Sequence, residues 1–375
     1  MTSEWNHFAL GEITELVIDY RGKTPKKLGG DWCKQGYRAL SAKNIKTGRI
    51  VQAETIRYID ESLYRKWMKD EVQRGDILIT SEAPFGQIFF WDSDEKIVLS
   101  QRLFCVRIKP EYDARFIYYY MTTPEFQSEL DGRATGTTVI GLRQPELMKC
   151  IIRCPEIQEQ KVIAAILSSI DAKIIANEKA NDNLQQQAQA IYSSMFIDNP
   201  DPAWSHGHLS DLITVKYGKD HKKLADGIYP VYGSGGIMRY VERPLYNKES
   251  VLIPRKGTLN NVMYVNQPFW SVDTMFYTEM KLPNVAKFVY HFVKAKDLAS
   301  MNAGSAVPSM TTDILNAMEV VIPSASALEE FESLVAPMYE AMEANDVQSK
   351  ALSQMRDTLL PKLMSGEIDV SDVQL

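Results

Sequence analysis

The chain has 375 residues, of which 45% are hydrophobic, and its formal net charge is −6. This composition excludes a disordered chain and is typical of two or three domains with apolar cores. The apolar runs fall short of the roughly 18 residues that cross a membrane, and the amino terminus lacks the features of a signal peptide. We therefore expect a cytoplasmic protein with no membrane contact.

The first part of the chain predicts a mixed globule followed by a long helix. Within residues 1–155, β-rich runs at 76–80 and 87–91 are broken by Gly and Pro turns, which predicts an α+β globule. Within residues 156–198, apolar side chains recur at spacings of three, four and seven, which predicts an amphipathic helix. A helix of about 40 residues is roughly 60 Å long, more than one small domain needs.

The second part of the chain repeats the first. Residues 136–155 align without a gap on residues 304–323, at an offset of 168, and residues 176–184 align on 344–352 at the same offset. We expect a second globule at residues 199–323 and a second long helix within residues 324–375. Two diverged copies of one unit usually perform one kind of task at two places.

The matching apolar stripes of the two helices predict how the copies are joined. Such stripes can be buried against each other, which favours an antiparallel coiled coil. The predicted fold is α+β, with two globular α/β-mixed domains separated by two long helices and related by a pseudo-two-fold repeat. Asn177 and Asn345 occupy equivalent places in the stripes and either fix the register or face solvent. The side chains expected to pair the helices are Ile163, Ile166, Ile170, Ile174, Leu184, Ile191, Leu334, Met338, Met342, Leu352 and Leu359.

Motifs for catalysis and for metal binding are missing from the sequence. Gly22-Lys23-Thr24 lacks the glycine that a phosphate-binding loop requires five positions earlier, where Val17 stands. His206 and His208 have no evident third ligand, and the 4 cysteines form no Cys-x-x-Cys pair, so we expect buried free thiols and no metal site. No methyltransferase or nuclease motif is recognisable, and we expect no catalytic residue.

The basic residues are unevenly distributed along the chain. Residues 215–258 carry a surplus of Lys and Arg over Asp and Glu, whereas acidic residues gather after residue 325. A local basic surplus suits DNA phosphates, although an ordinary solvated face has the same composition.

Arg, Lys and Asn side chains can bond to the edges of bases as well as to phosphates. The candidate DNA-binding residues of the first copy are Arg21, Lys23, Lys26, Lys27, Ser41, Lys43, Asn44 and Arg102. Those of the second copy are Lys219, His221, Lys222, Lys223, Arg255, Lys256, Thr258, Asn260 and Asn261.

Two segments of the chain resemble type I restriction-modification specificity subunits. One is EQKVIAAILSSIDAKI at residues 159–174, and the other is RDTLLPKLMSGEI at residues 356–368. Gly136-Thr137-Thr138 and Gly304-Ser305 resemble the motif that precedes each long helix in that family, so Thr137, Thr138 and Ser305 join the candidate DNA-binding residues. The second helix departs from the pattern at residues 324–331, SASALEEF, where the Glu-Gln-Lys run is absent.

The resemblance implies two target-recognition domains, each of which reads one half of a split DNA sequence, with the helices setting the spacer. It further implies two modification subunits and additional restriction or motor subunits as partners. S-adenosylmethionine, ATP and Mg²⁺ would belong to those partners, and this chain would need no cofactor. Two alternatives stay open, namely a fused DNA methyltransferase or nuclease with a diverged active site, and a coiled-coil scaffold that binds only protein.

Overall fold

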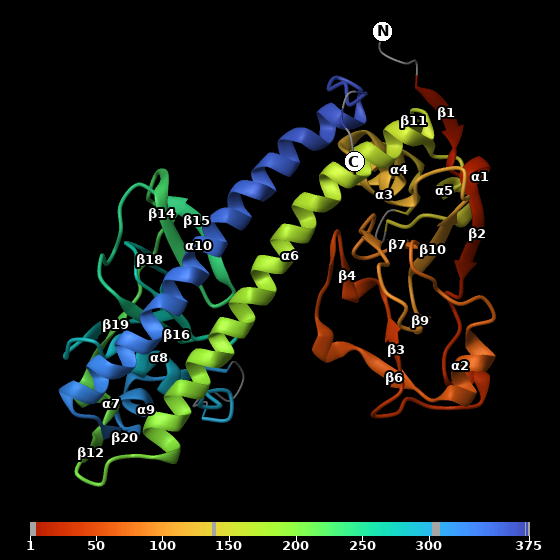
Figure 1. The fold of residues 1–375 in the computed structure, drawn as a ribbon. Coiled ribbons are helices and arrows are strands. Elements are labelled where there is room, and N and C mark those ends of the chain that lie inside the picture. Colours follow the sequence, from red (N-terminus) through yellow and green to blue (C-terminus); the bar gives the residue numbers. More distant parts are fainter. Residues whose placement is uncertain (1–4, 137–139, 302–307, 372, 374–375) are drawn as a thin grey trace. The chain divides into compact units, whose positions relative to one another are not determined.

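The computed structural model describes residues 5–136, 140–301, 308–371 and 373 (Figure 1). The chain divides into two compact units, of which unit 1 contains residues 1–175 and 348–375 and unit 2 contains residues 176–347. Each unit therefore contains one globule and a part of each long helix. Within the described ranges, no helix is both long enough and apolar enough to span a membrane.

The globule of unit 1 is built on two small sheets. The main sheet is antiparallel and has the order β2 (Thr14–Asp19), β10 (Leu103–Ile108), β7 (Ile77–Thr80) and β8 (Ile88–Phe90). The second has the order β6 (Arg57–Ile59), β3 (Tyr37–Leu40) and β9 (Ile97–Leu99), and its β3 and β9 are parallel. A further antiparallel pair joins β1 (Asn6–Ala9) to β11 (Ile151–Cys154), and a short hairpin joins β4 (Ile45–Lys46) to β5 (Arg49–Ile50).

Helices cover the sheets of unit 1, and the side chains of Asp60, Asp113 and Thr123 cap the starts of three of them. Asp113 accepts a hydrogen bond from the backbone N–H of Phe116 at the start of α3. Thr123 accepts one from the backbone N–H of Phe126 at the start of α4, whose first residue is Pro124. The buried apolar faces of α3 and of the main sheet share one core. The helices are α1 (Leu10–Ile13), α2 (Glu61–Trp67), α3 (Ala114–Met121), α4 (Pro124–Arg133) and α5 (Gln144–Leu147).

Unit 2 repeats the four-stranded sheet, the three-stranded sheet and the terminal strand pair of unit 1, but its described residues form no counterpart of the β4–β5 hairpin. Its main sheet has the order β13 (Ile213–Tyr217), β19 (Met275–Met280), β16 (Ser250–Pro254) and β17 (Met263–Val265). Its second sheet has the order β15 (Gly236–Val241), β14 (Asp226–Gly233) and β18 (Trp270–Ser271), and β14 and β18 are parallel as β3 and β9 are. The remaining elements are β12 (Ser205–His208), paired with β20 (Glu319–Ile322), α7 (Leu209–Leu212), α8 (Ala286–Lys294) and α9 (Thr312–Asn316).

The repeat of the sequence at an offset of 168 residues is also present in the structure, as one pair of equivalent backbone hydrogen bonds shows. In unit 1 the N–H of Leu142 donates to the carbonyl of Ser81 over 2.9 Å, and in unit 2 the N–H of Met310 donates to the carbonyl of Arg255 over 2.9 Å. Leu142 and Met310 are 168 residues apart, and Ser81 and Arg255 follow the equivalent strands β7 and β16. The predicted internal repeat is therefore confirmed.

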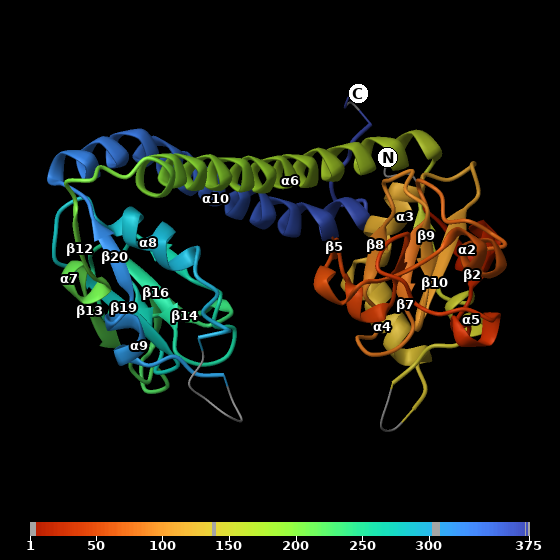
Figure 2. The same cartoon turned by 90° about the horizontal axis from the view of Figure 1, so that it is seen from below.

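The two long helices are α6 (Ile157–Ser193), which continues as a π-helical turn to residue 198, and α10 (Ala325–Met364). In unit 1, the beginning of α6 shares a core with the end of α10, through Ile163 and Leu363. In unit 2, the end of α6 packs on the beginning of α10, and the rings of Tyr192 and Phe331 are 6.2 Å apart. The helices are therefore antiparallel, as predicted, and Figures 1 and 2 show them side by side.

Most of the predicted pairing stripe is at least partly buried. Ile163, Ile170 and Ile174 are buried, whereas Leu334 is 46% exposed. The prediction for Leu334 is wrong, because the buried face of α10 passes through Phe331 and the neighbouring Val335 instead. The half-buried members of the predicted stripe are Ile166, Leu184, Ile191, Met338, Met342, Leu352 and Leu359.

The asparagines in the stripes form a polar layer within unit 2. Asn177 is only 2% exposed, and its Nδ2 donates to the backbone carbonyl of Asn345 over 3.4 Å. The Nδ2 of Asn345 donates to Oδ1 of Asn181 over 2.8 Å, and Asn181 donates to a carboxylate oxygen of Asp346 over 2.8 Å. A shifted register would bury these amides without partners, so this layer favours a single alignment of the helices.

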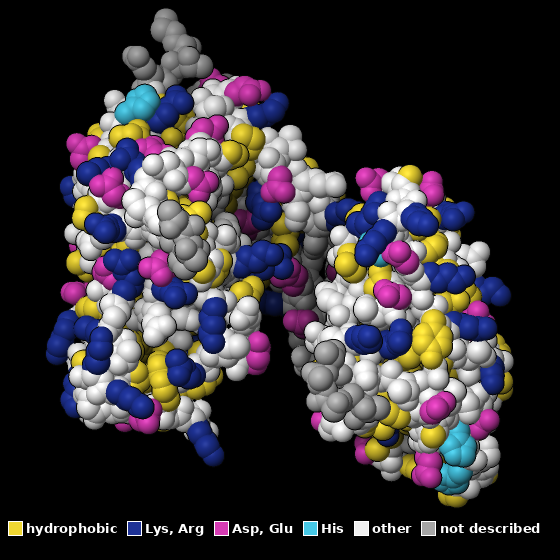
Figure 3. Space-filling view, turned by 180° about the vertical axis from the view of Figure 1, so that it is seen from behind, with side chains coloured by type: hydrophobic (Ala, Val, Ile, Leu, Met, Phe, Trp, Pro, Cys, Tyr) yellow, Lys and Arg dark blue, Asp and Glu magenta, His cyan; other side chains and the backbone are white. Residues whose placement is uncertain are grey.

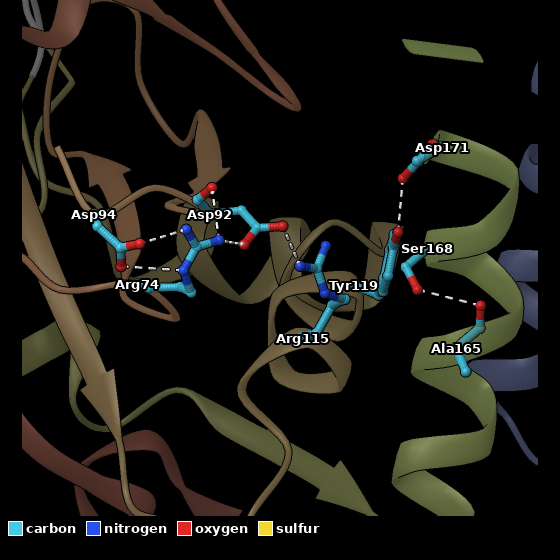
Figure 4. Close-up of polar contacts among 8 residues, drawn as sticks. All are labelled: Arg74, Asp92, Asp94, Arg115, Tyr119, Ala165, Ser168 and Asp171. Atoms are coloured by element: carbon cyan, nitrogen blue, oxygen red, sulfur yellow. Dashed lines mark hydrogen bonds and ion pairs between the residues drawn. The ribbon is translucent and has the colours of Figure 1, made fainter. Parts of the chain in front are cut away.

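Equivalent residues attach each globule to the long helices, but with different chemistry. In unit 1, Tyr119 of α3 donates its hydroxyl proton to Asp171 of α6 over 2.7 Å, and Asp171 pairs with Arg356 of α10 over 2.9 Å. Figure 4 shows Tyr119 reaching α6 beside a surface ion-pair chain that begins at Arg115. Burial and the adjacent Asp171 carboxylate raise the pKa of Tyr119, so its hydroxyl stays protonated and donates.

In unit 2, the attachment is neutral and centres on His291 of α8, which is fully buried. Its Nδ1 lies 2.8 Å from Oε1 of Gln189 on α6, and its Nε2 lies 2.9 Å from the hydroxyl of Tyr339 on α10. Burial lowers the pKa of His291 to about 4 from 6.5, so the imidazole is neutral at neutral pH. Its two nitrogens can then donate one hydrogen bond and accept one.

This depressed pKa predicts a loss of stability in acid. The folded state binds the imidazole proton less readily than the unfolded state, so the contribution of His291 is complete above pH 6.5 and is lost as the pH falls toward about 4. The loss should amount to on the order of 3 kcal/mol of unfolding free energy. Denaturant titrations across this pH range measure it. In His291→Gln the slope should flatten, and an equal slope in both proteins would contradict the assignment.

Candidate nucleic-acid interface

Several segments of unit 1 meet at one edge of its sheets and enclose a small cavity of about 190 Å³. They include the segment after β3, the start of β6, the β7–β8 loop and the turn between β9 and β10. Three cationic side chains line the cavity, Lys43, Arg57 and Arg102, and no acidic side chain lines it. Ser41, Thr55, Ser100 and Gln101 add hydroxyl and amide groups. The cavity therefore presents hydrogen-bond donors to an anion or to a base edge.

A second, larger hollow of about 490 Å³ adjoins the first and shares Gln101 and Arg102 with it. Arg21, which follows β2, lines this hollow together with Asp19 and Glu82. Arg102 therefore stands between the two hollows. Its guanidinium pairs with Glu82 over 3.1 Å, and half of its side chain stays exposed.

The backbone at Arg102 is unusual, because its φ of 63° lies in the left-handed region. The carbonyl of Arg102 is held by the N–H of Ser81 over 2.9 Å. This hydrogen bond ties the β9–β10 turn to the β7–β8 loop. The fold thus fixes the base of this side chain while its charged end faces the hollows.

Three of the predicted residues of unit 1, Asn44, Arg21 and Lys23, make hydrogen bonds or ion pairs within the globule. Asn44 is 1% exposed, its Oδ1 accepts from the hydroxyl and N–H of Ser41, and its Nδ2 donates to Gln52 and Thr55. The amide of Asn44 is therefore occupied by partners within the globule, and the residue lines the cavity wall. Its contact with DNA stays a prediction.

Arg21 and Lys23 are likewise engaged within the globule. Arg21 makes a two-pronged ion pair with Asp19, and its guanidinium lies 4.1 Å from the ring centre of Phe104. Lys23 donates to the carbonyl of Trp67 over 2.6 Å, and burial lowers the pKa of its ammonium group. Lys26 and Lys27 are exposed but do not line either hollow.

Sequence reasoning missed two residues of the cavity, Trp32 and Arg57. The guanidinium of Arg57 on β6 lies 3.9 Å from the ring centre of Trp32, which is a cation–π contact. A stacked pair of this kind offers both a flat face and hydrogen-bond donors to a nucleotide. The two residues are 25 positions apart in the sequence, and no motif links them.

In unit 2 the equivalent edge joins the β14–β15 turn, the β16–β17 loop and the β18–β19 turn. The N–H groups of Arg255 and Lys256 both donate to the carbonyl of Thr274, over 2.9 and 3.1 Å. Nδ2 of Asn261 donates to the carbonyl of Ser234 over 2.8 Å, which fixes the loop against the hairpin turn. Two of the predicted residues, Arg255 and Asn261, therefore hold this edge together.

The other predicted residues of unit 2 differ in how available they are. Lys219, Lys222, Lys223, Lys256 and Thr258 are exposed. The amide of Asn260 is occupied by Asp297 and by the N–H of Ala299, whereas the buried Nδ1 of His221 has no partner among the described residues. Thr137, Thr138 and Ser305 lie outside the described residues.

The surface charges, the cysteines and the groups that could bind a metal ion were predicted from the sequence and can be compared with the structure. Figure 3 shows Lys and Arg side chains spread among acidic and uncharged ones over one face of each unit. Cys105, Cys150 and Cys154 are buried free thiols, as predicted, but Cys33 is exposed. In the ranges that the structure describes, no group of His, Cys, Asp and Glu side chains is arranged to hold a metal ion.

Comparison with known proteins identifies the family. Residues 2–186 and 203–331 match the type I restriction modification DNA specificity domain, one copy in each half of the chain. The chain belongs to this family. As a specificity subunit it is the non-catalytic component, and catalysis resides on other subunits. The alternatives of a fused methyltransferase or nuclease and of a scaffold that binds only protein are therefore rejected.

The chain aligns with individual specificity subunits over most of their length. The chain is 33% identical to the HindI specificity subunit of Haemophilus influenzae, covering 80% of this chain and 88% of that protein. It is 24% identical to the MjaIX specificity subunit of Methanocaldococcus jannaschii, covering 80% and 79%. The crystal structure of a type I S subunit from M. genitalium has the same fold, with a TM-score of 0.62 at 18% identity over 96% of both chains.

The place of Arg102 between the two hollows predicts a measurable role in this specificity subunit. Arg102→Gln should weaken target binding by the assembled complex about 10- to 100-fold, as expected for ~1–3 kcal/mol from one base or phosphate contact. Fluorescence anisotropy with a target duplex measures it. Arg65→Gln is the matched control, because Arg65 on α2 is 76% exposed and lines neither hollow. Equal affinities of the two variants would contradict this role.

Proposed function

We propose that this specificity subunit reads a bipartite, asymmetric DNA sequence, with unit 1 reading one half and unit 2 the other. The observation that supports this most directly is the repeated edge, which combines the same backbone contacts with different side chains. Ser81 and Arg255 hold equivalent positions, and so do Arg102 and Thr274. Because the frames match and the exposed chemistry differs, each unit would favour a different base sequence.

We further propose that the chain acts inside a larger complex. Two modification subunits would methylate adenine with S-adenosylmethionine, and restriction or motor subunits would use ATP and Mg²⁺. The repeat supports two modification subunits, since each unit presents one copy of the same framework. The departure at residues 324–331 from the run at 159–161 suggests that the two docking sites differ in affinity.

Methylation mapping tests the bipartite site. A strain that expresses this subunit with its modification subunits should methylate one split sequence, with two unlike half-sites and a spacer of unspecified bases. Footprinting of the purified complex should protect both half-sites. A single continuous recognition sequence would contradict the proposal.

The long helices would set the spacer between the half-sites. Duplicating residues 174–180 in α6 and 342–348 in α10 lengthens each helix by one heptad, or about 10 Å at ~1.5 Å per residue. These segments lie opposite each other where Asn177 contacts Asn345, so the apolar stripes stay matched. Methylation mapping should then find a spacer about three base pairs longer, since base pairs rise ~3.4 Å each.

The control for this experiment is the duplication of residues 174–180 alone. It leaves the two helices unequal in length and should impair folding and methylation. Half-sites should be unchanged in the double duplication. A changed half-site with an unchanged spacer would contradict the role of the helices.

A further inference from the structure

The β14–β15 hairpin of unit 2 exposes large apolar side chains. Ile237 is 49% exposed and Met238 is 61% exposed, and both follow the turn at Ser234 and Gly235. The equivalent edge strand of unit 1, β6, exposes the cation Arg57 instead. Exposure of neighbouring apolar side chains on a surface costs solvation free energy, and such patches commonly mark interaction sites.

A β-bulge explains why both side chains are exposed. Val231 pairs with Arg239 and Tyr232 pairs with Ile237, so the ladder shifts register and Met238 is the additional residue. A regular strand would direct Ile237 and Met238 to opposite faces of the sheet. The bulge interrupts this alternation and redirects a side chain, as bulges next to functional sites often do.

The hairpin contacts two segments of unit 2 that carry lysines, one with Lys222 and Lys223 and the other with Lys256. At the tip of the hairpin, the carbonyl of Ser234 accepts a hydrogen bond over 2.8 Å from Nδ2 of Asn261. Asn261 belongs to the β16–β17 loop, which also carries Lys256. Further along β15, Arg239 donates to the carbonyl of Leu224 over 3.1 Å, next to the exposed Lys222 and Lys223. The hairpin that carries the apolar pair is therefore attached to two segments that carry exposed lysines, while its own cation, Arg239, is paired with Asp226 over 2.6 Å.

This combination favours DNA over a protein as the occupant. Flanking cations would hold the phosphates of a duplex, and an apolar pair could then reach into the groove. The major-groove edge of the base pairs carries one apolar group, the C5-methyl group of thymine. Methionine suits such a contact, because its side chain is flexible and polarizable.

We propose that Ile237 and Met238 recognise the methyl group of a thymine in the half-site read by unit 2. The inference rests on the proposed bipartite reading and adds the chemistry of one position. Unit 2 then selects thymine by apolar contact, whereas unit 1 offers polar and cationic groups at the equivalent edge. The pair is a specificity determinant and leaves catalysis to the partner subunits.

Replacing thymine by uracil tests this contact, because uracil lacks only the methyl group. The complex of this chain with its modification subunits would be bound to target duplexes in which each thymine of the two half-sites is replaced in turn. One position should weaken binding about fourfold, which corresponds to ~0.8 kcal/mol for one buried methyl group. In Met238→Ala, the same replacement should change affinity less than twofold.

Ile228→Ala is the matched control, because Ile228 lies on the same hairpin and is 78% exposed but far from the turn. It should keep the full response to uracil. A half-site without thymine on either strand, or a target on which no uracil matters, would overturn the inference while the bipartite reading stands. Loss of subunit assembly in Met238→Ala would instead identify a protein-docking surface and also overturn it. Failure of wild-type complex to bind any split target would refute the proposed function itself.

Discussion

The burial of two apolar stripes is the constraint on which this structure depends. Neither α6 nor α10 could remain helical over its length in water with such a stripe exposed, because most helical stability in proteins comes from packing. Each helix buries its stripe partly against the other and partly against a globule. The cores of both units accordingly contain residues of both helices, Leu167 and Leu363 in unit 1 and Tyr192 and Phe331 in unit 2.

The two units share one framework and differ in their loops. The main-sheet order, the parallel strand pair and the backbone contacts of Leu142 and Met310 recur in both units. The loops at the candidate interface are anchored in the cores by a few buried residues, such as Leu259 and Val262 in unit 2, so their exposed positions can differ without loss of packing. Different side chains at one edge are therefore compatible with one fold.

Much of the frame could be predicted from the sequence, since a gapless offset and a helical period are local signals. Less could be predicted where neighbouring positions compete or where distant segments meet. Leu334 and Val335 are adjacent apolar residues, and the period alone does not decide which one is buried. Asn44 is polar and follows a strand, yet its partner Thr55 comes from a segment that only the fold brings near. The contact between Trp32 and Arg57 depends in the same way on non-local strand pairing.

The two attachment joints have a consequence for exchange between the copies. A globule of unit 1 moved onto the helix segments of unit 2 would bring one hydroxyl oxygen, that of Tyr119, to Gln189 and Tyr339, which the two separate ring nitrogens of His291 serve. In the reverse exchange, the buried imidazole of His291 would meet the charges of Asp171 and Arg356 and could no longer stay neutral at low cost. Each globule is therefore matched to the helix residues of its own unit. A change of exposed loop residues leaves these joints intact, whereas an exchange of whole globules preserves them only together with the matching helix segments.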